Sequence, residues 1–386
     1  MPFPFPDTHA TDVQGATDVI DAPATATLDE WARATKKSSP RPTTWDSIIG
    51  NDRAKTQIRE AITAAKKDGR PLPHILIYAA AGSGKTTFSK IIAQDMGGGF
   101  VESTASTLEV PADVIRIIWK LNALRTTAPT NAASTLFLDE VHTLGVSRGR
   151  MAIDQESMFT LLEDFQFFHN LINKTVQDDA GCAWRLTDTV VRAWPFTVIG
   201  ATTEPGALSP PLLRRFLLQV ELEPYTEDEI ARILIGAGQR LGLTITEDAA
   251  AMLSKYSRRN PGTGNSLIEY ARARASTTER GTIDADTARE VIERLNLYPR
   301  GLNSTDVRIL RTLYDRSPKG MGQTEIARSV GISLSQFTGV NEPYLRLLNF
   351  VETQARRVIR PEGIRYLAEI GKVDTARPDV RAAMAK

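Results

Sequence analysis

Short runs of apolar residues alternate with longer helical patterns between residues 41 and 223. Helical patterns such as Thr86–Met96 and Ala112–Arg125 separate most of the runs. Short apolar strands alternating with helices are typical of a parallel sheet covered on both faces. We therefore predict an α/β domain over 41–223, whose strands lie at Ile75–Tyr78, Phe100–Glu102, Leu136–Leu138, Thr197–Ala201 and Leu218–Leu222.

The alternation stops between Gln166 and Trp194. Two β-like stretches, LINKTV and WRLTDTVVRAW, lie on either side of the turn-forming sequence DDAG. This arrangement predicts a long β-hairpin over about 166–194, inserted in the α/β domain and projecting from its sheet.

Residues 224–298 carry only helical patterns. Thr226 and Glu229 form a capping box, Thr246 followed by Asp248 opens a second helix, and Asp284 caps a helix that ends near residue 297. The pattern predicts a small helical domain that follows the α/β domain, in the position of a lid.

The residues after 298 are typical of a winged helix. The sequence QTEIARSVGISLSQF predicts a helix, a turn at Gly331 and a second helix begun by Ser333, and FVETQARRVIR alternates like a wing hairpin. The corner of this helix-turn-helix is formed by Ile326, Ala327, Val330 and Ile332. We assign the winged helix to 299–373 and predict a flexible tail over 374–386.

Charge is distributed unevenly along a nearly neutral chain. Lys and Arg number 47 against 46 Asp and Glu, a net charge of +1. Residues 1–40 are predicted to be an acidic, unstructured tail, in which only 27–35 has a helical pattern; the first thirty residues contain six acids and no Lys or Arg. From 301 onward 14 basic residues oppose 9 acidic ones. A nucleic-acid surface must therefore be local, and the carboxyl-terminal domain is where we expect it.

Several classes of protein are excluded by composition. No apolar run approaches the roughly 18 residues of a membrane span, and the amino end MPFPFPDTHA lacks the features of a signal peptide. A single cysteine, Cys182, excludes an internal disulfide and a cysteine-based metal cage. We expect a cytoplasmic protein with no membrane partner, in a bacterium or, if phage-encoded, in its host.

A phosphate-binding loop follows the first apolar run. The sequence AAAGSGKTT lies between the strand pattern HILIY and a helix, the context that a phosphate loop requires. Glycines let successive N–H groups converge on phosphate oxygens at a helix N-terminus. Lys85 would contact the β- and γ-phosphates, and Thr86 would bind Mg²⁺. The predicted nucleotide contacts are Ala81, Gly82, Ser83, Gly84, Lys85, Thr86 and Thr87. The usual first glycine is Ala79 here, which is compatible with the loop at negative φ.

Two further elements complete the predicted ATP site. In TLFLDEVH, Asp139 would hold the magnesium and Glu140 would polarise the attacking water. In VIGATTEPGALSPPLLRRF a strand ends at Thr202 and Thr203, which places hydroxyls near the γ-phosphate, and Arg214 and Arg215 follow. One of these arginines could reach a neighbouring subunit and neutralise charge on the transferring phosphoryl group. His142, beside the acids, is interpreted as a structural neighbour.

These segments resemble the RuvB-type branch-migration motors of the AAA+ class over roughly residues 41–367. The resemblance is carried by RPTTWDSIIGNDRAK, HILIYAAAGSGKTT, TLFLDEVHTL, LLEDF, PFTVIGATTEPGALSPPLLRRF, LEPYTEDEI and VNEPYLRLLNFVE. It implies an AAA+ P-loop core with a helical lid and a winged helix. It further implies a homo-hexameric ring around duplex DNA that hydrolyses ATP with Mg²⁺ and drives four-way junctions to migrate, in recombination and repair.

The resemblance also implies roles for single residues. Lys85, Thr86, Asp139 and Glu140 match the ATP and magnesium machinery, Thr203 matches the sensor hydroxyl with Thr202 as the alternative, and Arg215 matches the trans-acting arginine. Tyr225 matches an aromatic residue near the adenine, and Arg41, Pro42, Ile48 and Ile49 belong to the same pocket. Arg356 matches a DNA-contacting arginine of the wing. The hairpin at 166–194 corresponds to the segment that docks a RuvA-like junction-binding protein.

The chain departs from the family pattern at three places. Gly262 stands where the family has a lid arginine, so Arg258 or Arg259 would have to replace it, or the coupling is altered. Ile48 replaces a pocket tyrosine, and the hairpin is longer than expected. Such divergence suits a member carried by a phage or mobile element.

DNA contact is predicted for four arginines of the carboxyl-terminal domain. Arg356, Arg357 and Arg360 lie on the predicted wing, and Arg346 lies in the helix before it. Contacts of this kind go mainly to phosphates and do not read sequence. A protein-docking winged helix is the alternative.

Two other functions remain open from the sequence. One is a clamp-loader or helicase-loader ATPase, which shares the AAA+ core but usually carries an S-R-C segment that is absent here. The other is an ATP-gated DNA-binding scaffold with weak turnover, which the residues Ala79 and Gly262 make plausible.

Overall fold

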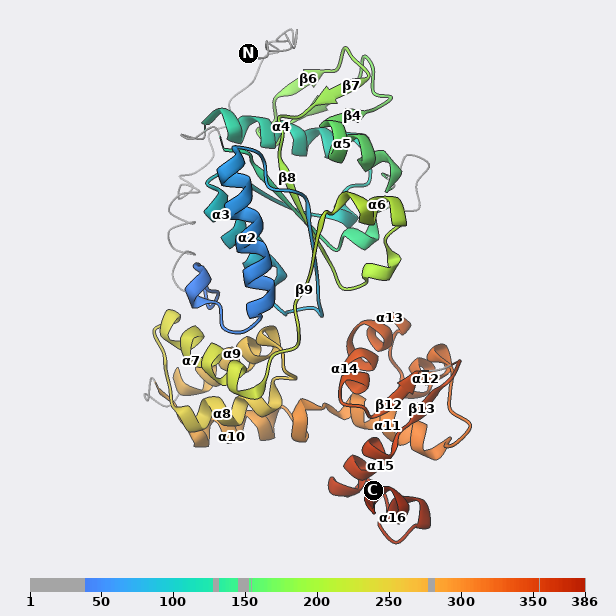
Figure 1. Ribbon diagram of the computed structural model, residues 1–386. Coiled ribbons are helices and arrows are strands. Elements are labelled where there is room, and N and C mark those ends of the chain that lie inside the picture. Colours follow the sequence, from blue (N-terminus) through green and yellow to red (C-terminus); the bar gives the residue numbers. More distant parts are fainter. Residues whose placement is uncertain are drawn as a thin grey trace, which may run out of the picture. The chain divides into compact units, whose positions relative to one another are not determined.

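The computed structural model describes residues 39–127, 132–144, 153, 155–276, 282–353 and 355–385. Of the predicted acidic tail only residues 39 and 40 are among them, so the helical pattern at 27–35 lies outside the described residues. The chain divides into two compact units, a first unit that ends at Tyr225 and a second unit that begins at Thr226 (Figure 1).

A five-stranded sheet with all strand pairs parallel forms the centre of the first unit, in the order β2-β3-β8-β1-β9. The strands are β1 (Ile75–Tyr78), β2 (Phe100–Thr104), β3 (Thr135–Asp139), β8 (Thr197–Thr202) and β9 (Leu218–Glu221). They lie where the apolar runs predict them, and the predicted α/β fold is confirmed. Because the strands are parallel, the carboxyl ends of the neighbours β1, β8 and β3 meet at one edge.

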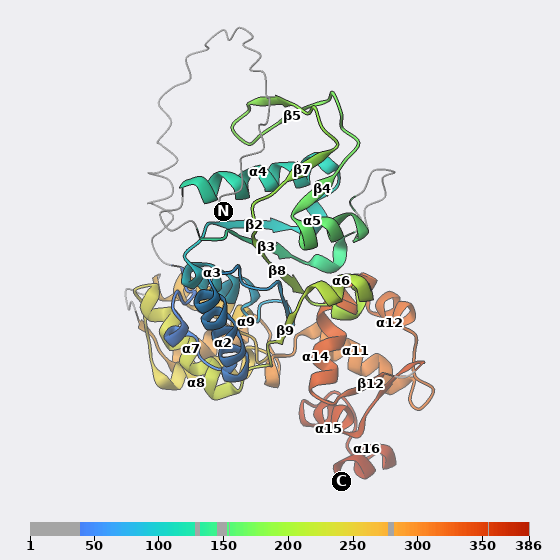
Figure 2. The same ribbon diagram turned by 45° about the horizontal axis from the view of Figure 1, so that its top comes forward.

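Successive residues of β1 face two different hydrophobic cores. Ile75 and Ile77 pack in the core that contains residues of α2 (Asp52–Asp68) and α3 (Lys85–Met96). Leu76, between them, packs in the core that contains residues of α4 (Pro111–Thr127) and α5 (Phe159–Asp164). Figure 2 shows the sheet between these two groups of helices. Burying one such side chain contributes about 1.5–3 kcal/mol, so both layers stabilise the strands.

The predicted hairpin is present, in two antiparallel ladders. β4 (Gln166–Phe168) pairs with β7 (Val190–Arg192), and β5 (Thr175–Gln177) pairs with β6 (Ala183–Arg185). It does not project freely. Arg116 and Asn122 of α4 donate to backbone carbonyls of Gln177 and Arg192, at 2.8 and 3.0 Å. The hairpin therefore lies along α4 (Figure 1).

The second unit begins with a helical lid, whose predicted caps are confirmed. Glu229 N–H donates to Thr226 Oγ1 at 3.1 Å, and Thr287 N–H donates to Asp284 Oδ1 at 2.9 Å. The helices are α7 (Glu227–Arg240), α8 (Glu247–Tyr256), α9 (Pro261–Ser276) and α10 (Ala285–Arg294). Two short strands, β10 (Thr244–Ile245) and β11 (Thr282–Ile283), pair in parallel. Two residues are too few to show a β period, so the sequence pattern missed them.

A winged helix completes the second unit. Its first helix, α11 (Ser304–Asp315), precedes α12 (Gln323–Val330), which ends at Gly331 in the left-handed conformation (φ 70°). The predicted second helix of the motif is three segments: α13 (Leu334–Gln336), a π-helical turn η7 (Phe337–Asn341) and α14 (Glu342–Leu347). Ser333 caps it as predicted. The wing is the antiparallel pair β12 (Val351–Thr353) and β13 (Arg357–Ile359).

The prediction of a flexible tail from residue 374 is wrong up to residue 385. After α15 (Pro361–Glu369) the chain forms another helix, α16 (Pro378–Met384), which buries Val380 and Ala383. Val380 belongs to the core of the winged helix. The two small side chains gave too weak an apolar pattern to predict this helix.

Candidate active site

The loop after β1 has the backbone of a phosphate cradle. Gly82 and Gly84 adopt left-handed φ angles of 79° and 106°, and α3 begins at the next residue, Lys85. An L side chain at such angles would be strained. Ala79 is absent from the described residues with positive φ, so the alanine fits the loop as predicted. Glycine turns leading into a helix N-terminus form an anion site.

Lys85 is held at the base of this loop. Its buried Nζ donates to the carbonyl oxygens of Ala79 and Ala80, at 3.0 and 3.3 Å. Burial lowers the pKa of Lys85, and the charges of Glu140 and Asp139 oppose that shift. The ammonium group is thus placed among backbone oxygens and near two acids, where it can serve as a point charge for a phosphate.

Asp139 and Glu140 lie at the end of the neighbouring strand β3. Burial raises the pKa of Asp139, and the N–H of Glu140, which donates to Asp139 Oδ1 at 3.0 Å, opposes this. Glu140 adopts a left-handed backbone (φ 49°), which is uncommon for a residue other than glycine. Strained conformations of this kind cluster at functional sites.

The site is compatible with Mg²⁺ held partly by nucleotide. No cluster of three or more His, Cys, Asp and Glu side chains that could hold a metal occurs in the described part of the chain. Mg²⁺ usually keeps several waters and takes one or two carboxylates plus substrate phosphates. Asp139 and the partly exposed Thr86 in the first turn of α3 fit that requirement.

The two threonines at the end of β8 are in different environments. Thr202 is completely buried, with its Oγ1 2.9 Å from His142 Nδ1 and accepting from the N–H of Glu204. Thr203 is only partly buried, and its Oγ1 donates to Glu140 Oε2 at 3.3 Å. Thr203 is therefore the better candidate for a hydroxyl that meets a nucleotide. His142, which the sequence left without a role, contacts both Thr202 and Glu140.

The two arginines after β8 also differ. Both belong to α6 (Pro210–Arg215), and Arg214 is exposed. Arg215 Nη2 pairs with Glu163 Oε1 at 2.8 Å, and its guanidinium lies 4.0 Å from the ring centre of Phe159. Both partners are in α5. The predicted trans-acting arginine is thus folded against its own subunit.

The predicted adenine pocket is partly a structural core. Tyr225 is buried and donates from its hydroxyl to Ser83 O at 3.1 Å, which connects the end of the first unit to the phosphate loop. Ile48, at the position of the family's tyrosine, packs in the core beside α2. Arg41 is exposed, whereas Pro42 and Ile49 are half-buried.

Arg258, one of the two suggested replacements for the missing lid arginine, contacts the winged helix. Arg258 Nη1 lies 3.5 Å from Asp306 Oδ2, and its guanidinium lies 4.2 Å from the ring centre of Tyr344. Both partners belong to the winged helix. Burial raises the pKa of Tyr344 to about 12, so its hydroxyl remains neutral beside this cation. Gly262 lies in the first turn of α9, and the replacement of the lid arginine by Arg258 or Arg259 stays a prediction.

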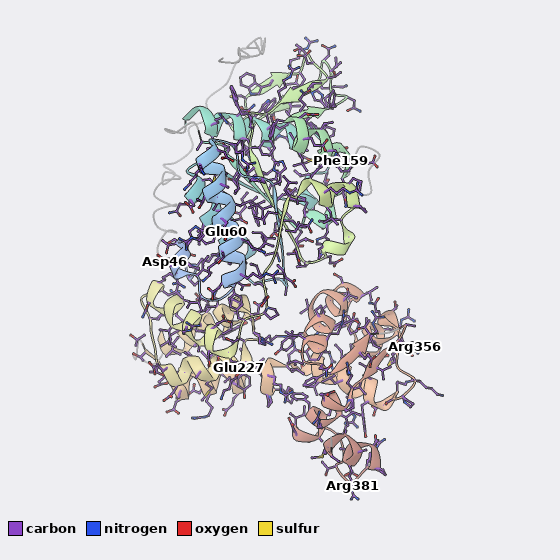
Figure 3. The ribbon with its side chains drawn as sticks, in the orientation of Figure 1. Asp46, Glu60, Phe159, Glu227, Arg356 and Arg381 are labelled. Carbon is purple, nitrogen blue, oxygen red and sulfur yellow. The ribbon has the colours of Figure 1, made fainter. Side chains whose placement is uncertain are left out.

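The four predicted DNA-contacting arginines are not equivalent. Arg356 is exposed, at the rim of the winged helix (Figure 3), and pairs with the exposed Glu325 at 3.0 Å. Arg346 is exposed and Arg360 is half-buried. Arg357 pairs with Glu342 at 2.7 Å, and its side chain is only 13% exposed. Arg357 lies on the wing as predicted, but Glu342 holds its side chain inside the domain, and its DNA contact stays a prediction.

Known proteins resemble this chain over most of its length. The family model "Holliday junction DNA helicase RuvB P-loop domain" matches residues 40–222, and "RuvB C-terminal winged helix domain" matches 299–368. The "Holliday junction branch migration complex subunit RuvB" of Methanoregula boonei is 33% identical over 85% of this chain and 91% of its own length. Its counterpart in Kosmotoga olearia is 31% identical over 85% and 89%.

A solved structure agrees with these relatives. The Thermotoga maritima RuvB Holliday junction branch migration motor shares 28% identity, with a TM-score of 0.69 over 85% of this chain and 98% of that one. No helix in the described part is both long and apolar enough to cross a membrane. With its phosphate loop, paired strand-end acids, lid and winged helix, the chain belongs to the RuvB family.

Proposed function

We propose that this protein is an ATP-driven motor that moves duplex DNA and drives branch migration of four-way junctions. The observation that carries the proposal is the convergence of Lys85, Glu140 and Thr203 at the carboxyl edge of the sheet, next to the phosphate loop. Phosphoryl transfer needs mainly positioning and charge stabilisation, and these residues supply both. When bound, Mg²⁺ would neutralise charge on the phosphate oxygens, held by Asp139 and Thr86.

Each residue has a definite task in this mechanism. Lys85 binds the phosphates as a point charge, and Glu140 orients the attacking water. Thr203 contacts both the γ-phosphate and Glu140. It can therefore transmit to Glu140 which nucleotide is bound. The positive charge that the transition state still lacks comes from Arg215 of the adjacent subunit in a homo-hexameric ring. Tyr225, Arg41, Pro42 and Ile49 are assigned to the nucleotide's base, and the buried Ile48 packs in the core beside α2.

The winged helix holds the DNA. Arg356 is the principal phosphate contact because it is exposed and its present partner, Glu325, is exposed as well. Arg346 and Arg360 are secondary contacts. Such contacts are indifferent to sequence, which a moving motor requires.

A second protein docks on the hairpin over 166–194, and a RuvA-like junction-binding protein suits that position. The hairpin exposes Phe168, Ile172 and Trp184. Large apolar side chains exposed on one inserted element suit a docking surface.

The function is tested by steady-state ATP turnover of the full chain without DNA, with linear duplex and with an immobile four-way junction. Lys85→Ala serves as the blank. Turnover should rise with duplex and rise further with the junction. Equal stimulation by linear duplex and junction would indicate a loader. Turnover at the level of the blank in all three would indicate a scaffold and overturn the motor.

A further inference from the structure

The carboxylate of Glu140 is held by two side chains from different elements. His142 Nδ1 lies 3.2 Å from Glu140 Oε2, and the Thr203 hydroxyl donates to the same oxygen at 3.3 Å. His142 Nδ1 is also 2.9 Å from Thr202 Oγ1, which accepts from Glu204 N–H. A continuous polar network therefore joins the end of β3 to the end of β8.

The backbone explains why these groups meet. β3 and β8 pair in parallel up to Leu138 opposite Gly200, and Glu140 and Thr202 each follow that last pair by two residues. The left-handed conformation of Glu140 then turns the chain into the 3-10 helix η3 (Val141–Thr143). Thr143 fastens this turn, because its N–H and its hydroxyl each donate to Glu140 O at 2.8 Å. The tight turn brings His142 back to the carboxylate two residues before it.

The contact with Glu140 favours the imidazole tautomer that carries its proton on Nδ1. An ionised carboxylate can only accept hydrogen bonds, so the 3.2 Å contact is favourable when Nδ1 carries the proton. The Thr202 hydroxyl can accept from Nδ1 and from Glu204 N–H with its two lone pairs. With the proton on Nδ1, that single N–H lies between Thr202 Oγ1 at 2.9 Å and Glu140 Oε2 at 3.2 Å, so His142 links the two residues.

We propose that His142 is a positioning residue for ATP hydrolysis, which orients the Glu140 carboxylate and couples it to the end of β8. This inference rests on the proposed function, in which Glu140 orients the attacking water. The residues after Glu204 form η5 (Pro205–Ala207) and lead directly into α6, which carries Arg214 and Arg215. A displacement of α6 in one subunit is therefore transmitted to the Glu140 carboxylate of the same subunit through Thr202 and His142. Partners that orient a functional side chain are commonly as important as the side chain's direct contacts.

Three substitutions of His142 separate positioning from packing. His142→Leu keeps bulk but removes the donor. His142→Asn places an amide N–H at the position of Nδ1, and His142→Gln places it one bond farther away. We expect kcat to fall about tenfold to a hundredfold in the leucine and glutamine variants, the range for lost orienting partners. The asparagine variant should recover most of that turnover. The KM for ATP and the affinity for a fluorescent ADP should stay near those of the unchanged protein, since Glu140 acts on water and not on binding.

The matched control is His169→Leu, which alters another buried imidazole, in the hairpin, where Nδ1 accepts from Leu171 N–H. It should leave kcat unchanged. A folded His142→Leu variant with full kcat would overturn the inference. If that variant does not fold, equal turnover in the asparagine and glutamine variants would overturn it as well.

Glu140→Gln separates the proposed role of Glu140 from the inferred role of His142. Loss of turnover with retained ADP binding supports the role of Glu140, and a normal His142→Leu then sinks the inference alone. Full turnover in Glu140→Gln would instead overturn the proposed role of Glu140 itself.

Discussion

Two pairs of adjacent arginines, one pair in each unit, contain one exposed side chain and one largely buried side chain that a glutamate holds. In the first unit Arg214 is exposed and Arg215 pairs with Glu163; in the second, Arg356 is exposed and Arg357 pairs with Glu342. The two held arginines differ in their partners. The Glu163 side chain is 56% exposed, whereas that of Glu342 is 7% exposed and also accepts from Thr353 at 3.3 Å.

The burial of the glutamate decides what its arginine can do. Water can solvate Glu163 when Arg215 leaves, so no buried charge is left behind, although Arg215 also gives up its contacts with Phe159 and Pro211 O. Glu342 would be left as an unpaired buried charge, at a cost of about 3–5 kcal/mol. Arg215 can therefore leave its glutamate without stranding a buried charge, as its proposed role requires, whereas Arg357 is a structural part of the wing.

The largest expected effect is on kcat for ATP hydrolysis, and it should differ between Arg215 and Arg214. Arg215→Ala should lower kcat by about 10³–10⁵, the worth of a trans-acting arginine in phosphoryl transfer. Arg214→Ala, one residue away and exposed, is the matched control and should retain turnover. ATP turnover of assembled protein, with the oligomeric state checked by light scattering, measures both. Equal losses in the two variants would break the distinction.

The next effect is on stability and separates Arg357 from Arg356. Arg357→Ala should lower the free energy of unfolding of the winged helix by about 3–5 kcal/mol, because Glu342 remains buried without its partner. Arg356→Ala should cost at most about 1 kcal/mol, because its pair with Glu325 is exposed. Urea unfolding of the full chain, followed by circular dichroism, tests this. Comparable midpoints would show that Arg357 is not structural.

In DNA binding, unlike in stability, Arg356 should matter more than Arg357. Arg356→Ala should weaken duplex binding similarly for unrelated sequences and reduce the slope of log affinity against log salt by about one. Arg381→Ala, an exposed arginine of α16 in the same domain (Figure 3), is the control and should change the slope less. A fluorescence-anisotropy titration at several salt concentrations measures the slopes. An unchanged slope in Arg356→Ala would remove the wing from the DNA interface.

The smallest effect concerns a histidine with no functional partner. Burial lowers the pKa of His74 below 6.5. Val198 N–H donates to its Nδ1 at 3.0 Å, and its Nε2 lies 2.9 Å from Leu162 O. Below pH 6.5 the unfolded chain therefore binds a proton at this histidine more readily than the folded chain does. The free energy of unfolding consequently falls as pH decreases below 6.5.

His74→Asn should remove this part of the pH dependence. The free energy of unfolding measured between pH 7.5 and pH 5.5 should then decline less steeply than in the unchanged chain. Parallel declines in the two proteins would assign the effect to other groups.

Strands, helix caps and the nucleotide motif were all predictable because their signals are local. The five strands of the sheet followed from short apolar runs, and Thr226 and Asp284 marked helix starts three residues before the N–H groups that they accept. The left-handed glycines of the phosphate loop are likewise dictated by adjacent residues, since only a glycine takes such angles without strain.

The tertiary structure alone decided which charged side chains remain available. Arg356 and Arg357 look alike in sequence, as do Thr202 and Thr203. Yet Arg356 is exposed and Thr203 partly exposed, whereas Arg357 is held inside by Glu342 and Thr202 is completely buried beside His142. The role of His142 depends on the register of β3 against β8, and that of Arg258 on Asp306, 48 positions later. The sequence specifies the chemical type of each side chain. Its partners and its burial depend on chain segments that only folding brings together.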